Sequence, residues 1–331
     1  MLAAMTSRRR GVLSAIAVVA GAGLLVWQVR ETGVQEISRG LLAVGGWGAV
    51  AILLLSWLRF AARSTGWTAL IATDTPPGRA VAAVIAGDAA GNLTPLSMLV
   101  SEPAKAALLS WSVPYLSTTA ALASLAAEMF FFGVSVAVYV ILGAGALLYV
   151  YPVDATVRTA GLVTVGAMSM ALLLAVWMAL RKPSVVGAIL SRVPVPPIRA
   201  IAGRVRAFEQ TAYASTTHPG ARLGVVAVAA AIFHVLSFLE LWLTLWLITG
   251  ESQIVAAFVL DTVGRLTNVL FKVVPFQLGV LQVGSELVAR AIGLAPGIGV
   301  TVSLVRTARV LVWSVVGLLI LARVRRHPAK S

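Results

Sequence analysis

The chain has 331 residues, of which 59% are hydrophobic and only 11% are charged. A soluble domain is about 25% charged, so this composition excludes a water-soluble enzyme, and the abundance of apolar residues excludes a disordered chain. The 26 Lys and Arg against 12 Asp and Glu leave a net charge of +14, which in so apolar a chain indicates basic cytoplasmic loops rather than nucleic-acid binding. Cysteine is absent and histidines are few, so we expect no disulfide, thiol nucleophile, metal site or cofactor. The sequence predicts an all-α polytopic membrane protein.

Apolar blocks long enough to enter a bilayer, which takes about 20 residues per crossing, follow one another along the chain. They are residues 11–29, 41–72, 80–110, 117–149, 157–180, 221–249, 253–292 and 298–322. A secretory signal is the competing interpretation of the first block, because Arg8, Arg9 and Arg10 precede it. The run is longer than a typical signal core and no Ala-x-Ala-like site follows it, so we interpret it as an uncleaved helix.

Basic residues concentrate at the N-terminus, in residues 181–222 and in the C-terminal tail. The positive-inside rule therefore predicts that both termini lie in the cytoplasm. Residues 181–220 are predicted to be a cytoplasmic, basic, amphipathic loop that lies on the anionic leaflet.

With these segments on one side, blocks 80–110 and 253–292 must each begin and end on the same side of the membrane. We therefore predict six full spans and two re-entrant helical hairpins, broken at Pro95 and at Pro275 and Gly279. Non-helical backbone at that depth is tolerated only where it is buried in protein or lines a wet cavity.

The two hairpin blocks share a D-x-x-G-x-L-T motif, which begins at Asp88 and again at Asp261 and contains Gly91 and Gly264. Each half then comprises span, span, hairpin and span, an odd number of crossings, which predicts an inverted-topology repeat of the kind found in transporters. Residues 1–180 hold the first half, with spans 11–29, 41–72 and 117–149 and hairpin 80–110, together with span 157–180, which opens the second half; residues 221–331 hold the rest, with spans 221–249 and 298–322 and hairpin 253–292.

Many charged residues fall inside the apolar blocks, where a lone charge costs about 2.5–3.5 kcal/mol. Three acid–base pairs share a helix face by their spacing, namely Glu102 with Lys105, Asp261 with Arg265 and Glu286 with Arg290. Each pair is either a self-neutralising strut or part of a polar site. His234 lies in an otherwise apolar span and is predicted to make a helix–helix hydrogen bond, with a proton relay as the alternative.

The pairs Arg59/Arg63 and Arg306/Arg309 each double the positive charge on one helix face. Planar bidentate donors of this kind suit a phosphate or carboxylate head group, while snorkelling to the interface is the alternative for Arg59 and Arg63. Glu102, Glu128 and Glu286 would orient the bases or carry a coupling proton. The predicted substrate-binding residues are Arg306, Arg309, Arg59, Arg63, Lys105, Glu102, Glu128, Glu286 and Asn92, and the predicted hairpin-geometry residues are Pro95, Pro275, Gly279, Gly91 and Gly264.

These motifs resemble the transmembrane, flippase-like domain of the lysylphosphatidylglycerol synthase family. The matching pieces are Asn92, Pro95, Glu102 and Lys105; Glu128 early in the next span; Pro275, Gly279 and Glu286; and Arg306 in the last span. The form of the first motif is most similar to the hopanoid-associated branch. The sequence departs from the family at Leu96–Leu99, where a glycine is common. We expect no soluble aminoacyl-transferring domain of the kind found in full-length synthases, and therefore no synthase chemistry.

The resemblance implies a lipid transporter or flippase-like protein of the bacterial cytoplasmic (inner) membrane that moves or presents an anionic or polar lipid, of phospholipid, polyprenyl-linked or hopanoid type. A non-catalytic membrane partner of a lipid-modifying enzyme or glycosyltransferase is the alternative. No catalytic set stands out, and an integral-membrane transferase would need an acid–base pair such as Glu128 with His234.

Overall fold

Long apolar helices form the body of the protein. The computed structural model describes residues 34–92, 97–192, 196–215, 220–270 and 279–326, and within these ranges the secondary structure is helical. Five helices in this part of the chain are long and apolar enough to cross a membrane: α2 (Val34–Thr68), α5 (Thr118–Val150), α6 (Ala155–Arg181), α9 (Gly220–Thr249) and α12 (Ile298–Arg326). They confirm the helices predicted over five of the apolar blocks. The predicted span 11–29 lies outside the described residues.

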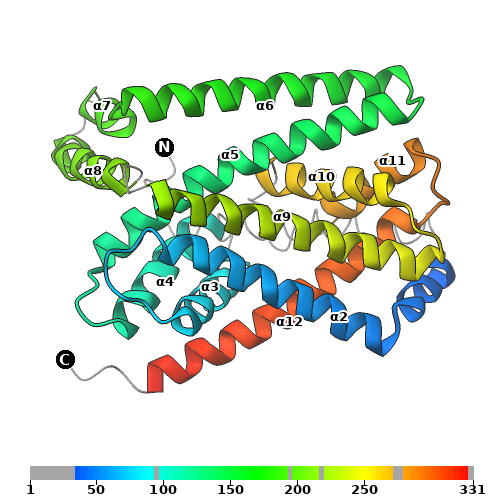
Figure 1. Ribbon diagram of the computed structural model, residues 1–331, viewed down its shortest axis with the longest axis horizontal. Helices are drawn as coiled ribbons and strands as arrows, with labels where there is room; N and C mark the ends of the chain where they lie inside the picture. Colours follow the sequence, from blue (N-terminus) through cyan, green and yellow to red (C-terminus); the bar gives the residue numbers. More distant parts are fainter. Residues whose placement is uncertain (1–33, 93–96, 193–195, 216–219, 271–278, 327–331) are drawn as a thin grey trace.

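The two blocks interpreted as hairpins form pairs of short helices. The first pair is α3 (Pro77–Asn92) with α4 (Ser97–Ser112), and the second is α10 (Ile254–Leu270) with α11 (Val280–Ala291). In the described part of the chain these helices have 12 to 17 residues each, fewer than the about 20 that one crossing typically takes. The pairs lie toward opposite ends of the bundle (Figure 1). Pro95 and Pro275 lie outside the described residues.

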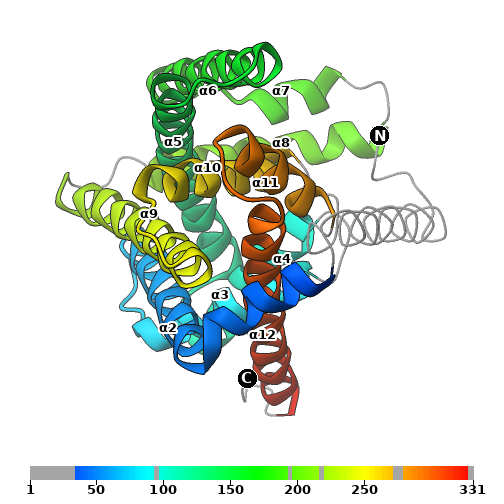
Figure 2. The same ribbon diagram turned by 90° about the vertical axis from the view of Figure 1, so that its right-hand side faces the viewer.

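Two further helices, α7 (Val185–Arg192) and α8 (Pro196–Ser215), occupy the region predicted to be amphipathic. Figures 1 and 2 show them lying across one end of the bundle, at a steep angle to the long helices. The C-terminal end of α12 lies at the same end of the bundle (Figure 1).

Helix α12 connects the two short pairs, because it packs against α3 near one end and against α11 near the other. Two glycines allow this close approach. A Cβ at Gly317 would overlap Ile85 and Ala89 of α3, and a Cβ at Gly299 would overlap the backbone of Glu286 in α11. Small residues at such crossings let helix backbones approach closely within a membrane.

The apolar core is divided into two main clusters. One surrounds the α3–α4 pair and includes the buried Trp67, whose indole N–H donates to the Ser124 hydroxyl at 3.1 Å. The other surrounds the α10–α11 pair and includes Leu245 and Ala257. Between these clusters lies a layer of charged side chains, which forms the candidate site.

Candidate functional site

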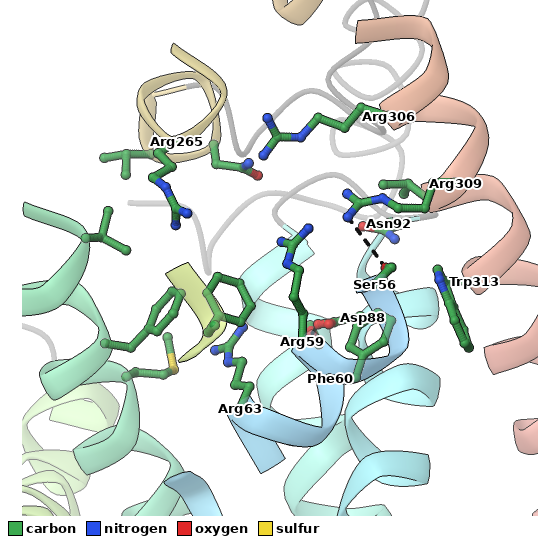
Figure 3. Close-up of a pocket in the computed structure, with 18 of the residues that line it drawn as sticks. Ser56, Arg59, Phe60, Arg63, Asp88, Asn92, Arg265, Arg306, Arg309 and Trp313 are labelled. Atoms are coloured by element: carbon green, nitrogen blue, oxygen red, sulfur yellow. Dashed lines mark hydrogen bonds between the residues drawn. The ribbon is translucent and has the colours of Figure 1, made fainter. Parts of the chain in front are cut away.

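A cavity of about 600 Å³ lies at the level of this charged layer. Among the described residues its wall carries five arginines and two carboxylates, and Figure 3 shows several of the guanidinium groups directed into the same space from α2, α10 and α12. The polar residues that line it are Ser56, Arg59, Arg63, Asp88, Asn92, Ser101, Glu102, Arg265, Asn268, Arg306, Thr307, Arg309 and Ser314. Apolar lining comes mainly from α5 and from the rings of Phe60, Phe132, Phe233 and Trp313.

Two of the arginines share one buried carboxylate. Arg59 of α2 and Arg309 of α12 both donate to Oε2 of Glu240 on α9, at 2.7 Å and 2.8 Å. Arg309 also reaches the Ser56 hydroxyl at 3.5 Å (Figure 3). Snorkelling of Arg59 is therefore not what the structure shows, because its guanidinium is directed inward to an acid. Glu240 thus joins three long helices at one point.

A second buried carboxylate, Asp261, serves Arg265 and Arg306. Arg265 donates to Asp261 Oδ2 through Nε at 3.2 Å and Nη2 at 2.8 Å, and its guanidinium stacks over Tyr139 at 4.0 Å. The nearest Arg306 nitrogen lies 3.6 Å from Asp261 Oδ1, beyond normal hydrogen-bond distance. The Arg306 guanidinium lies against Gly264, and a Cβ at position 264 would displace it from this position.

The remaining arginine, Arg63, is held within the first half of the chain. Its Nε lies 3.4 Å from Glu128 of α5, and its guanidinium lies over the Phe132 ring at 4.9 Å. Arg59 is placed in the same way over Phe233, at 4.7 Å. Contacts with aromatic faces stabilise these guanidinium groups without using their hydrogen-bond donors.

The α3–α4 pair brings acids to the cavity. The amine of Lys105, which is 1% exposed, lies 2.7 Å from Asp88 and 3.0 Å from Glu102. Ser101 adds a hydrogen bond to Asp88 at 3.0 Å. Both carboxylates line the cavity while Lys105 lies behind them, so this side of the wall is negative.

The arrangement of partners gives the cavity its electrostatic character. Three of the carboxylates that neutralise arginines, on Glu128, Glu240 and Asp261, are at most 8% exposed and lie behind the guanidinium groups rather than in the wall. Burial of so many charges is expensive unless they pair. The pairing keeps the set close to neutral, yet the cavity surface is predominantly cationic.

Glu286 has a different location. It lies where α11 meets α12, accepts hydrogen bonds from Arg290 at 2.7 Å and from the backbone N–H of Gly297 at 2.8 Å, and reaches the N–H of Val300 at 3.2 Å. These contacts cap the start of α12, where a carboxylate is stabilised by the helix dipole. Glu286 therefore has a local structural environment away from the cavity.

The three glycines predicted to shape the hairpins lie in different structural environments. Gly91 is buried in the last turn of α3, Gly264 lies within α10 beside Arg306, and Gly279 precedes α11 with a φ of 80°. Only Gly279 adopts a backbone conformation that favours glycine, and its N–H donates to Gln282 at 2.7 Å.

Six of the nine predicted substrate-binding residues line the cavity, while Lys105 and Glu128 contact lining residues from behind and Glu286 lies elsewhere. The six are Arg59, Arg63, Asn92, Glu102, Arg306 and Arg309. Asp88 and Arg265 also line it and carry the same signal in the sequence, a charge inside an apolar block. Ser56 and the aromatic rings carry no such signal. The interhelical hydrogen bond predicted for His234 is confirmed, between its Nε2 and the Ser135 hydroxyl at 2.9 Å.

The fold and the cavity define a polytopic helical membrane protein with an arginine-rich internal site. The family model of the lysylphosphatidylglycerol synthase TM region matches residues 12–318, and the chain belongs to this family. The match covers the membrane region of the family and does not place the chain in the hopanoid-associated branch. No curated protein and no solved structure matches the chain significantly. The family and the apolar helices indicate a lipid-related role in a membrane.

Proposed function

We propose that the protein binds a lipid by its anionic head group inside the cavity and moves or presents it across the bacterial cytoplasmic membrane. The family points to a lipid, and the wall of the cavity favours a negatively charged group. Phosphate, as in a phospholipid or a polyprenyl phosphate, suits several convergent guanidinium groups because each offers planar, bidentate donors.

Arg306 carries this proposal. Its side chain is 12% exposed and lines the cavity, and within the described residues its guanidinium has an ion pair at 3.6 Å but no hydrogen bond. Its uncommitted donors face the cavity, where the phosphate of a ligand can supply acceptors. A phosphate between Arg306, Arg309 and Arg59 would satisfy those donors, and Asp261 and Glu240 would hold the bases in position from behind.

The movement of the lipid would use the two helix pairs. We take α3–α4 and α10–α11 to be re-entrant hairpins of an inverted repeat, entered from the cytoplasmic and the external side respectively. Their shared motif and their location at opposite ends of the bundle support this (Figure 1). The inner ends of the pairs line the cavity through Asn92 and Asn268, as expected for a transporter whose site lies at the repeat interface.

The orientation in the membrane follows from the basic end of the protein. Helices α7 and α8, with their arginines, and the end of α12 lie at one end of the bundle (Figure 1). We place this end in the cytoplasm against the anionic leaflet, with both chain termini on that side.

Lipid translocation in reconstituted vesicles tests the function. The purified protein is inserted into vesicles that contain a fluorescent phospholipid, and the fraction that crosses is measured by chemical quenching from outside. We expect Arg306→Ala to lower the rate by about tenfold or more, because each tenfold corresponds to about 1.4 kcal/mol of lost stabilisation. Arg290→Ala is the matched control, since Arg290 is 48% exposed and pairs with Glu286 away from the cavity.

Equal rates of lipid translocation in the wild type and Arg306→Ala would contradict the assignment of Arg306 to the lipid-binding site. A wild type that binds phospholipid but moves none would favour presentation of the lipid to an enzyme over translocation.

A further inference from the structure

The cavity changes character from one side to the other. On the α2–α12 side its wall is polar and buried, with Ser56 at 3% and Arg309 at 9% exposure. On the opposite side the wall consists of apolar residues of α5 and α6, including Val136 and Met168, and it ends at the exposed Gly133 and Ala171. The cavity therefore has a closed cationic end and an open apolar mouth.

The mouth lies where α5 and α6 separate. These helices are joined at residues 151–154 and diverge from there toward the end that carries α7 and α8 (Figure 1). Helix α6 packs chiefly against α5, and of its residues only Val157 and Gly161 are buried. That residues from the middle of α6 nevertheless line the cavity means that the cavity extends past α5 to the side of the bundle.

The depth of the mouth limits what can pass through it. Gly133 and Met168 lie near the midpoints of two helices that each span a bilayer. No charged residue occurs in α5 after Glu128 or in α6 between Arg158 and Arg181. The rim is thus uncharged and level with the hydrocarbon core, where a water-soluble ligand would lose its hydration.

We propose that this mouth is the lateral entrance for the acyl chains of the bound lipid. The proposal rests on the proposed function and specifies its substrate as a membrane-embedded amphiphile, taken from the side rather than from water. The phosphate lies against the arginines at the closed end. The chains leave between α5 and α6 and stay in the bilayer core while the head group crosses.

Plugging the mouth tests the proposal. Gly133→Trp places an indole at the rim, and Gly145→Trp on the same helix is the matched control, because an added Cβ meets no heavy atom within 4 Å at either position and Gly145 does not line the cavity. We expect Gly133→Trp to lower phospholipid translocation about tenfold and the control to stay within about twofold of the wild type. Translocation by Gly133→Trp at the control rate would overturn the lateral entrance and leave the proposed function standing. Absence of both phospholipid binding and translocation in the wild type and the control would instead reject the proposed function.

A second measurement decides the matter if Gly133→Trp fails to fold. A phospholipid with a diazirine at the end of one acyl chain is photo-crosslinked to the wild type and to Arg306→Ala in vesicles, and the adducts are mapped by mass spectrometry. We expect crosslinks near Gly133 and Ala171 that decrease in Arg306→Ala, while crosslinks to the outward-facing Leu174 remain unchanged. Crosslinks near Gly133 and Ala171 that do not depend on Arg306 would come from bulk lipid and would overturn the proposal.

Discussion

The two short helix pairs share a sequence motif but present opposite charges to the cavity. In α3–α4, Asp88 lines the cavity with 31% of its side chain exposed, and its base, Lys105, is buried behind it. In α10–α11 the order is reversed, because Asp261 is 1% exposed and Arg265 lines the cavity in front of it. The two occurrences of the motif thus give one acidic wall and one basic wall. The orientation of each helix decides which member of an ion pair can meet a ligand.

Removal of the motif carboxylate in the second pair should have the largest effect. Asp261→Asn would leave Arg265 and Arg306 buried without a carboxylate, and breaking a buried pair costs about 3–5 kcal/mol. Asp88→Asn should cost much less, because Lys105 keeps Glu102 at 3.0 Å. Thermal unfolding of the detergent-purified proteins, followed by tryptophan fluorescence, measures the difference.

Equal losses of stability in Asp261→Asn and Asp88→Asn would contradict this contrast, since they would mean that the two carboxylates contribute equally to the stability of the protein. Asp261→Glu serves as a control that keeps the charge.

The second contrast is between Glu102 and Glu286, the acidic residues that follow the first and the second D-x-x-G-x-L-T motif. Glu286→Gln weakens hydrogen bonds to Arg290 and to the N–H groups of Gly297 and Val300, so we expect a loss of about 1–3 kcal/mol in stability. Glu102 instead lines the cavity, so Glu102→Gln should alter lipid translocation more than stability. Unfolding and translocation assays on both proteins make the test. The contrast fails if Glu286→Gln impairs translocation per folded molecule more than Glu102→Gln does.

The third contrast concerns the proposed topology, in which α3–α4 enters the membrane from the cytoplasmic side and α10–α11 from the external side. The cysteine substitutions that test it should leave stability almost unchanged. Because the chain has no cysteine, Asp74→Cys before α3 and Glu251→Cys before α10 each introduce one thiol at an exposed position. A membrane-impermeant maleimide added to intact cells should label the thiol at position 251, and the thiol at position 74 only after permeabilisation. Labelling of both in intact cells would contradict the inverted arrangement.

Local spacing predicted the features that lie within one helix. The apolar blocks gave the five long helices, and the spacing of four residues gave the ion pairs Asp261 with Arg265 and Glu286 with Arg290. Spacing places both members of a pair on one face but does not say where that face points. The sequence could therefore not distinguish Glu286, which caps α12, from Glu102, which lines the cavity.

Contacts between distant segments were beyond the reach of the sequence. Glu240 meets Arg59 and Arg309 only because α2, α9 and α12 pack with particular rotations about their axes. A charge inside an apolar block did signal a polar interior, and Asp88 and Arg265 could have been chosen on that ground. The choice between the wall of a cavity and a buried strut required the packing.

The central claim is that Arg306 holds the phosphate of a lipid, and native mass spectrometry of the purified protein tests it most directly. The wild type, Arg306→Ala and Arg290→Ala are each reconstituted with phosphatidylglycerol and phosphatidylethanolamine, released from the membrane and weighed with their bound lipid. We predict that the wild type and Arg290→Ala retain a phospholipid and that Arg306→Ala loses most of it. Equal lipid occupancy in all three proteins would contradict the account.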